Sequence, residues 1–453
     1  MCEALGLDPA KWWRAAAGVG FGRTLPRGVD MIRTGPPSRL WPAPVRGYNR
    51  GTLHRHAHPE PVVKRIISAV VLGACALAVA HAPAAEVPPA PRVITDRDAL
   101  FRKPQVLDLV ITLDKKETEA LQRDPRKYVK CLLKDGKDEY VDVGIHLKGA
   151  AGSYRDFNDK PGLTLNVDKF TDAQRYRGME KLHLANSAQD PSFLSELICG
   201  EMFRAAGVPA SRISFAKLTL NGRSRGLYYI KEGYDKTFLK ENFGSSNGNF
   251  YDGGFLREID QPLEVNPGKG DVKDHADLKA LWAAVREPNE RKRFEKLEKL
   301  LDLDRFISYM VIEMITSDWD GYPSKCNNYR IYHDPKTNKI TFIPSGMDQM
   351  FHDINWPIMP DWGGGVAREL MNTKEGKKRY LARLREIMDK KIYNPVALIR
   401  RLDELEAVVQ PALATVDRGA ARDYKNQVNR LRFAIKEREK IVNDQIKRLP
   451  PEK

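Results

Sequence analysis

SDWDGY, residues 317–322, is a polar loop that directly follows an apolar segment with the 3.6-residue period of a helix, residues 304–315. Two asparagines at 327–328 come next, and a short β-hairpin is predicted after them. Asp348 lies just beyond the second strand of this hairpin. The hairpin would bring the two polar segments to one place. We therefore expect their carboxylate and amide oxygens to form a single site.

The residue types in this pattern suit phosphoryl transfer. That reaction needs one carboxylate to orient the acceptor hydroxyl and hard oxygen ligands to hold Mg²⁺ on the phosphates. Asp320, an asparagine amide (Asn327 or Asn328) and Asp348 would supply these groups. Protein kinases place a helix, an Asp, an Asn, a hairpin and a second Asp in the same order, although with a shorter loop. Loops rich in Asp also bind structural Ca²⁺ or cap helices, and these alternatives stay open.

A second candidate region lies in the first half of the chain. The turn KGAAGS follows a predicted strand, and its two glycines allow backbone N–H groups to turn toward a ligand such as phosphate. The candidate phosphate-binding residues are Lys148, Gly149, Gly152, Ser153 and Lys160. Glu232, at the end of another predicted strand, is a candidate partner for a phosphate-holding lysine. An ordinary tight turn and a solvated carboxylate are the alternatives.

Hydrophobic periods divide the chain into a β-rich front half and a mainly helical back half. The strands expected in the front half are 106–113, 128–133, 139–148, 163–167, 181–185, 214–220 and 226–231. The helices expected are 191–206, 234–241, 275–286, 289–300, 304–315 and most of 366–447. Asp114 and Glu117 form a capping box at the start of a further short helix. This order of elements predicts an α+β fold.

Charge and cysteine content limit the class of protein. The 453 residues carry a net charge of +15, yet residues 1–65 alone hold eleven Lys/Arg against four Asp/Glu. The remaining excess is spread among mixed charges, which argues against nucleic-acid binding and fits an anionic ligand such as a nucleotide, or an acidic partner. Cys131, Cys199 and Cys326 are too widely spaced for a zinc motif or a disulfide framework. One bridge with one free thiol remains an open alternative.

The N-terminal part predicts export. Residues 1–63 are rich in Arg, Pro and Gly without a sustained period, and we expect a non-native or disordered leader there. Residues 64–82 combine a basic flank, a short apolar run and a small-residue exit, as in a signal peptide, and the run is shorter than the ~20 residues of a membrane span. Cleavage would leave no stable membrane span, whereas lipidation of Cys75 or an uncleaved anchor are the alternatives. A Pro-rich linker, 83–104, and one domain, 105–447, are expected to follow.

Several motifs together resemble the CotH family, named for a spore-coat protein kinase. They are GIHLKG at 144–149, Lys160-Pro161, LHLAN at 182–186 with Asp190 and Glu196, GVPA at 207–210, Asn221-Gly222, Gly226-Leu227-Tyr228, Glu232, Trp319-Asp320-Gly321, Asn328-Tyr329, Ile343-Pro344 and Asp348. Their order and spacing agree with the family over most of residues 105–445.

The resemblance implies an atypical protein-kinase-like fold. It also implies an exported kinase that transfers the γ-phosphate of ATP to Ser or Thr hydroxyls of extracytoplasmic proteins, using Mg²⁺ or Mn²⁺. The roles implied for single residues are Asp320 as catalytic Asp, Asp348 and Asn328 as metal ligands, Lys148 or Lys160 as phosphate-contacting lysine, and Glu232 as partner of that lysine.

One position departs from the family pattern. The family commonly shows Trp-Asp-x-Asp after the second hairpin strand, whereas this chain has Gly346 in place of the first Asp. Either Asp348 and Asn328 suffice for the metal, or the chain is a degenerate, non-catalytic member that binds ligands at a cell surface or in a matrix. A metal-dependent hydrolase ranks last, because it needs an activated water and a general base, and no suitable histidine lies in the key motifs except His352.

Overall fold

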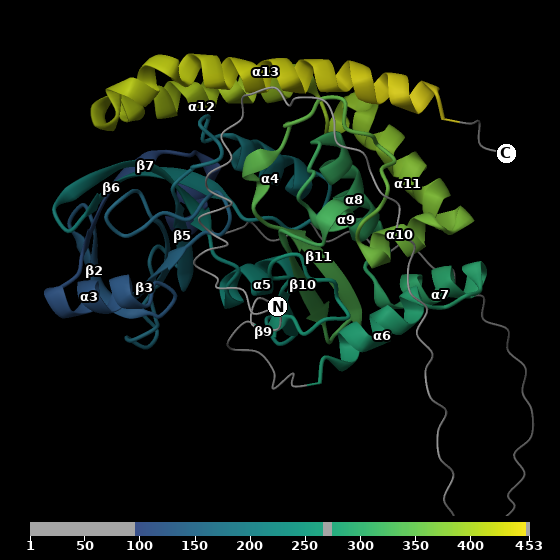
Figure 1. The fold of residues 1–453 in the computed structure, drawn as a ribbon, viewed down its shortest axis with the longest axis horizontal. Coiled ribbons are helices and arrows are strands. Elements are labelled where there is room, and N and C mark those ends of the chain that lie inside the picture. Colours follow the sequence, from purple (N-terminus) through teal and green to yellow (C-terminus); the bar gives the residue numbers. More distant parts are fainter. Residues whose placement is uncertain (1–95, 266–273, 450–453) are drawn as a thin grey trace, which may run out of the picture. The chain divides into compact units, whose positions relative to one another are not determined.

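Seven strands from the first half of the chain close into a barrel (Figure 1). The computed structural model describes residues 96–265 and 274–449. The barrel strands are β1 (Val106–Thr112), β2 (Val129–Asp135), β3 (Asp138–Lys148), β4 (Gly162–Asn166), β5 (Lys181–Ala185), β6 (Ile213–Leu220) and β7 (Arg223–Glu232), in the order β1-β2-β3-β4-β5-β7-β6. All neighbours pair antiparallel except β1 and β6, whose parallel pairing closes the barrel.

The alternation of residues along each strand separates the barrel interior from its outer face. In β3, Val143, Ile145 and Leu147 are buried in the hydrophobic cluster inside the barrel. His146 and Lys148 alternate with them and line a cavity on the other side of the strand. The same strand therefore supplies both core and site.

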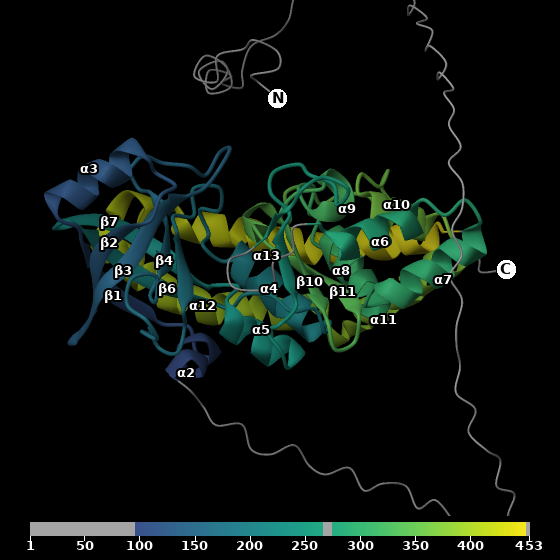
Figure 2. The same ribbon diagram turned by 90° about the horizontal axis from the view of Figure 1, so that it is seen from below.

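The second half of the described chain is mainly helical around a small sheet (Figure 2). The sheet has the order β11-β10-β8-β9 and consists of β8 (Asn249–Asp252), β9 (Glu264–Val265), β10 (Tyr329–Asp334) and β11 (Lys339–Pro344). The first half contributes the helices α3 (Lys115–Arg123), α4 (Ser195–Ala205) and α5 (Lys236–Phe243). The second half contains α6 (Ala276–Val285), α7 (Glu290–Leu300), α8 (Leu303–Ile315), α9 (Tyr322–Lys325), α10 (Gly365–Met371), α11 (Lys374–Glu386), α12 (Pro395–Val416) and α13 (Arg418–Lys447). It also contains a short 3₁₀ helix, η2 (Met347–Gln349), and a short π-helix, η3 (Ile387–Lys391).

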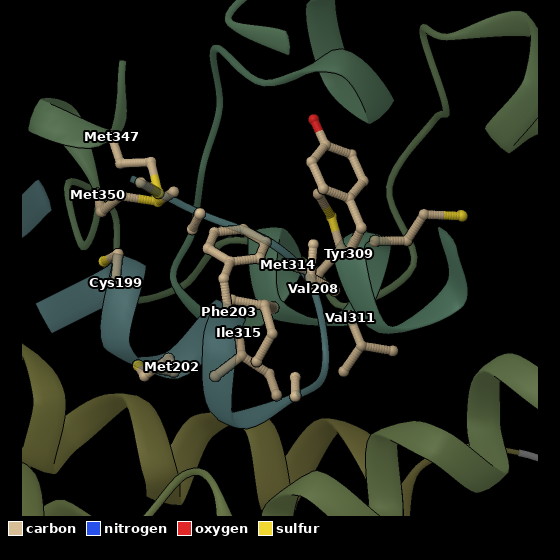
Figure 3. Packing of buried hydrophobic residues seen from close by; sticks show 14 of the residues in the cluster. Cys199, Met202, Phe203, Val208, Tyr309, Val311, Met314, Ile315, Met347 and Met350 are labelled. Carbon is tan, nitrogen blue, oxygen red and sulfur yellow. The ribbon is translucent and has the colours of Figure 1, made fainter. Parts of the chain in front are cut away.

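Helices α4 and α8 meet in a core rich in sulfur and aromatic side chains (Figure 3). Met202 and Phe203 of α4 and Met314 of α8 are buried there, and Met347 and Met350 enter from the segment that follows β11. Methionine fills irregular gaps well because its side chain is unbranched and flexible. The segment that carries Asp348 therefore rests on the same core as the helix that precedes Asp320.

The C-terminal helices α12 and α13 lie side by side and extend along both the barrel and the helical part (Figure 1). From α13, the fully buried Arg438 donates hydrogen bonds to the carbonyl oxygens of Ile315 (3.0 Å), Met314 (2.7 Å) and Ile354 (2.7 Å). Burial lowers the pKa of Arg438 to about 10. Two of these carbonyls end α8, so the guanidinium caps the helix that leads into the Asp320 loop.

The predicted mixture of helices and strands is confirmed, and closure of the strands into a barrel was not predicted. The predicted linker is wrong for its last part, because α2 (Asp96–Arg102) is a helix that buries Arg97, Leu100 and Phe101. The predicted leader and signal peptide lie outside the described residues. Within the ranges that the structure describes, no helix is long and apolar enough to cross a membrane. Cys131, Cys199 and Cys326 are all free thiols.

Candidate active site

A cavity of about 1060 Å³ lies between the outer face of the barrel and the loops that carry Asp320 and Asp348. Strands β3, β4, β5 and β7 form one wall, and the turn at residues 149–153 forms part of the rim. Asn328, Arg330 and the residues around Asp348 line the opposite side. The structure thus brings together the two polar regions that the sequence analysis singled out.

The barrel wall of the cavity includes two rows of side chains across neighbouring strands. In one row, His146, Thr164, His183 and Lys231 follow each other from β3 to β7. The Thr164 hydroxyl and His183 Nδ1 lie 3.0 Å apart. Lys148 belongs to the second row, where the neighbouring strands carry only small residues before β7. Small side chains leave room for a ligand over the wall.

The wall is strongly cationic. Burial, together with the neighbouring Lys231, lowers the pKa of Lys148 to about 8, while Glu196 and Asp348 oppose the decrease. Burial, together with the surrounding lysines, also lowers the pKa of His183 well below its usual value, so this histidine is neutral at pH 7. A desolvated group of positive charges without enough counter-charge favours an anionic ligand.

One buried ion pair anchors this wall to α4. Lys231 Nζ contacts Glu196 Oε1, and the two side chains are 5% and 4% exposed. The Tyr229 hydroxyl donates to the other Glu196 oxygen at 2.6 Å. Burial would raise the pKa of Glu196, but Lys231 outweighs this and holds it below the usual range. A carboxylate fixed in this way holds the ammonium of Lys231 at the cavity wall.

Glu232 does not have the predicted partner. Its carboxylate accepts hydrogen bonds from Arg212 Nε (2.9 Å) and Nη2 (2.7 Å), and Arg97 lies 3.4 Å away. Consecutive residues of a strand point to opposite faces, so Glu232 is directed away from the cavity that Lys231 lines. The prediction that Glu232 pairs with a phosphate-holding lysine is therefore wrong, because the pair on the cavity side is Lys231–Glu196.

Lys160 also lies apart from the cavity lining. Its ammonium packs over the rings of Phe193 and Tyr228, at 5.1 and 5.4 Å from the ring centroids. Burial lowers its pKa to about 8. Of the two candidate lysines, Lys148 is the one that reaches the site.

The predicted glycine turn lies at the rim of the cavity. Gly149 and Gly152 have φ values of +107° and +85°, which L side chains rarely adopt. The Ser153 hydroxyl accepts a hydrogen bond from the backbone N–H of Ala150 at 3.2 Å, which stabilises the turn. The conformation explains why both positions are glycine.

Asp320 lies on the loop between α8 and α9, and two amides hold its carboxylate. Asn327 and Asn328 both donate from Nδ2 to Asp320 Oδ2, at 3.1 and 2.9 Å. Burial raises the pKa of Asp320, and the two amide hydrogen bonds oppose the increase. Since both amides use the same oxygen, Oδ1 remains available to a ligand hydroxyl.

Asp348 lies on η2, shortly after β11, and is half-buried. Burial, together with the nearby Glu196 and Asp190, raises its pKa to about 7. Beside it, Gly346 has a φ of +67°, and a Cβ there would lie 2.7 Å from Asn328 Oδ1. Glycine at this position lets the Asn328 amide approach the Asp348 segment closely.

The residues fit a metal ion that takes part of its shell from other molecules. Among the described residues, no group of three His, Cys, Asp or Glu side chains is placed to hold a metal. The Asn328 Nδ2 is occupied by Asp320, which leaves its Oδ1, next to position 346, as a ligand in the cavity that Asp348 also lines. Mg²⁺ commonly has only one or two carboxylate ligands and completes its shell with water and phosphate. The donor set therefore suits Mg²⁺ or Mn²⁺ bound together with a phosphate group.

Two members of the site had no role assigned from the sequence, although Glu196 belongs to the motifs that resemble the family. Glu196 stands in the first turn of α4 and Lys231 one position before Glu232. The alternation in β7 was the available signal, because Tyr229 and Lys231 share one face and Glu232 lies on the other. A strand of buried residues on both faces does not show in its sequence which face meets the ligand.

Comparison with known proteins identifies the family. The family model described as CotH kinase protein matches residues 145–442. This chain belongs to the CotH family. The match begins within β3 and ends within α13, so it spans the cavity of this CotH chain and both loops that carry its aspartates.

The curated relatives of this CotH chain are distant. Inner spore coat protein H of Bacillus subtilis is 24% identical over 243 residues, which cover 51% of this chain and 62% of that protein. Invasin CotH3 of Rhizopus delemar is 24% identical over 269 residues (51% of this chain, 43% of the invasin), and invasin CotH2 is 24% identical over 342 residues (68% and 55%). The chain therefore spans about half the length of the curated relatives it matches.

Among solved structures, the HipA–HipB–operator DNA complex of Shewanella oneidensis MR-1 matches with 12% identity and covers 76% of this chain and 75% of that one. Its TM-score of 0.36 is too low to carry an argument.

Proposed function

We propose that this CotH-family chain is an atypical protein kinase that transfers the γ-phosphate of ATP to Ser or Thr hydroxyls of proteins outside the cytoplasm. The observation that carries the proposal is the composition of one cavity. It combines a buried lysine–glutamate pair, a second desolvated lysine, an amide-held aspartate and a desolvated aspartate. Phosphoryl transfer is catalysed mainly by positioning and charge stabilisation, which such a set supplies.

The barrel wall is the proposed phosphate-binding side. Lys148 and Lys231 would meet the phosphates, and Glu196 would hold Lys231 in place, as a helix glutamate does for the strand lysine of protein kinases. The turn at 149–153 would add backbone N–H groups above the phosphates. On this proposal the barrel acts as the N-terminal lobe, and the helical part after β8 acts as the C-terminal lobe, of a protein-kinase-like fold.

Asp348 and the Asn328 amide oxygen would hold Mg²⁺ or Mn²⁺, which supplies charge neutralisation for the phosphates when bound. Asp320 would accept a hydrogen bond from the acceptor hydroxyl at Oδ1, because its other oxygen is already held by two amides. The amides also prevent the carboxylate from rotating. The acceptor oxygen is then oriented before the reaction.

An exported location fits the signal peptide predicted at 64–82 and the names of relatives, a spore coat protein and fungal invasins. Cleavage would leave the domain, from about residue 96 to 447, free of a membrane span, and lipidation at Cys75 would anchor it at a surface.

Gly346 favours one competing function, a non-catalytic CotH-like protein that binds nucleotide, glycan or protein at a surface. Asn328 occupies the space into which a side chain at 346 would extend, so no acidic ligand can be added there without moving it. If two protein ligands hold the metal too weakly for turnover, the cavity would bind a nucleotide without transferring phosphate.

Phosphate transfer from γ-labelled ATP by the purified full chain tests the proposal. Autophosphorylation and labelling of casein would be measured with Mg²⁺ and with Mn²⁺, beside Asp320→Asn and Asp348→Ala. Asp172→Asn, an exposed loop position, is the matched control. Labelling that both site variants abolish and the control retains would support the kinase. If neither metal supports labelling while ATP still binds, the competing function is favoured; if ATP does not bind either, the nucleotide site is refuted.

A further inference from the structure

A pair of acidic side chains without a cation lies beneath the Asp320 loop. Glu313, in the last turn of α8, is fully buried, and neither of its carboxyl oxygens has a hydrogen-bond partner in the described part of the chain. The Tyr309 hydroxyl, one helical turn earlier, is also buried; it faces this carboxyl and opposes the increase in its pKa, but the two groups do not reach ordinary hydrogen-bond geometry. Unpaired buried polar groups are costly, so their presence here requires a physical explanation.

Asp318 is the second acid, and Gly321 shows how near it is. A Cβ on Gly321 would lie 1.9 Å from Glu313 Oε2 and 2.9 Å from Asp318 Oδ2, so both oxygens border the same small space. Asp318 Oδ1 accepts the backbone N–H of Asp320 at 3.0 Å. Glu313, Asp318 and the backbone of the proposed catalytic residue therefore form one connected group. Any side chain at 321 would separate the two acids.

No positive charge faces this pair in the described residues. The groups around it are Tyr309 of α8, Asp320 and the Gly321 backbone in the loop, Cys199 of α4, and Asp348 beyond β11. Two carboxylates this close in a desolvated site do not both stay ionised, because their repulsion is not screened. The N–H groups of Asp320 and Gly321 favour charge on Asp318, whereas Glu313 receives no donor from the loop backbone.

We propose that Glu313 keeps a proton at neutral pH and donates it in a hydrogen bond to Asp318, which in turn fixes the backbone of Asp320. Glu313 is thus a positioning residue with a bound proton. The direction of its pKa agrees, since burial and the charge of Asp318 raise it well above the usual glutamate value. Burial also raises the pKa of Asp318, to about 7. The proton itself does not depend on the proposed kinase function; only the consequence for Asp320 rests on it.

Stability as a function of pH tests the bound proton directly. A glutamate whose folded-state pKa is raised contributes stability below its unfolded value, and this contribution is lost as the pH rises toward the folded value. We expect the unfolding equilibrium constant of the full chain, divided by that of Glu313→Gln, to rise about tenfold per pH unit above about pH 5, because one proton is released on unfolding. Gln keeps the size of the side chain and a hydrogen-bond donor. Glu119→Gln, at an exposed site on α3, should give a ratio that does not change with pH.

Infrared spectroscopy provides a second test that does not require unfolding. The difference spectrum between the wild type and Glu313→Gln at pH 7 should contain the carbonyl band of a protonated carboxylic acid, and the Glu119→Gln difference spectrum should lack it. The proposal would be overturned if the stability of the wild type and of Glu313→Gln changed with pH in the same way and the infrared band were absent. A pH slope that disappears when Ca²⁺, Na⁺ or K⁺ is varied would also overturn it, because a cation would then balance the two carboxylates.

The consequence for the reaction is tested separately. If the kinase is active, Glu313→Gln should keep phosphate transfer and extend its activity toward higher pH, whereas Glu313→Leu should lower kcat with little change in KM for ATP. A Glu313→Gln variant with the same pH profile of activity as the wild type would refute the positioning role. The bound proton itself is decided by the pH dependence of stability and by the infrared band.

Discussion

The Lys231–Glu196 pair should dominate the stability of the cavity wall, and a double-mutant cycle can measure it. Both side chains are almost fully buried, so Lys231→Met leaves the carboxylate of Glu196 in a desolvated site, with the Tyr229 hydroxyl as its hydrogen-bond donor and Lys148 as a nearby cation. Removing one member of a buried ion pair typically costs about 3–5 kcal/mol of unfolding free energy. Replacing both, as Lys231→Met/Glu196→Gln, leaves no unpaired charge and should cost clearly less than the sum of the single changes.

Urea denaturation of the four proteins at pH 7 gives the coupling energy, which we expect to be at least about 2 kcal/mol. The Lys130–Asp142 pair is the matched control, because its atoms are 2.9 Å apart but both side chains are 47% exposed. The same cycle on that pair should give less than about 1 kcal/mol. Equal coupling energies in the two cycles, or additive losses for Lys231 and Glu196, would refute the view that desolvation makes this pair important.

Three further predictions concern other parts of the fold. Arg438→Met should lower the unfolding free energy by about 3 kcal/mol, measured in urea, because three carbonyl oxygens lose a charged donor; a loss like that of an exposed Arg→Met change would contradict this. Hydrogen bonding to Asp277 raises the pKa of His333, so His333→Gln should reduce thermal stability more at about pH 5 than at about pH 8, by at most about 1 kcal/mol. Gly346→Asp should destabilise more and weaken Mn²⁺ binding more than Gly178→Asp, where φ is +81° but the space is open; equal effects would show that backbone strain alone is responsible.

Much of the local structure was predictable because short-range chemistry determines it. Asp114 caps α3 by accepting the N–H of Glu117 at 2.7 Å, as the capping box predicts. Asn221 and Gly222 both have positive φ at the turn between β6 and β7. Asp320, Asn328 and Asp348 meet at the cavity because the hairpin β10–β11 returns the chain to its starting point.

The features that the sequence did not reveal depend on contacts between distant segments. The barrel closes through β1 and β6, which are parallel and separated by four other strands along the chain. No local pattern encodes which strands will be neighbours. Lys231 and Glu232 are consecutive in β7 and point to opposite faces of the strand. Both faces of β7 are buried there, so the sequence does not show which of the two residues faces the cavity. In the sequence, Glu313 lies within an apolar helical segment. Only the three-dimensional structure shows that its carboxyl group lies close to that of Asp318.

Because Arg438 is synthesised after every residue that lines the cavity, the cap on the end of α8 forms late. All side chains that line the cavity have left the ribosome before α13 is made, yet the carbonyls at the end of α8 lack their cap until residue 438 has emerged. A nascent chain, or one cleaved before residue 438, would therefore possess every cavity residue without the guanidinium that caps α8. The end of α8 thus depends on a guanidinium that lies 123 positions further along the chain.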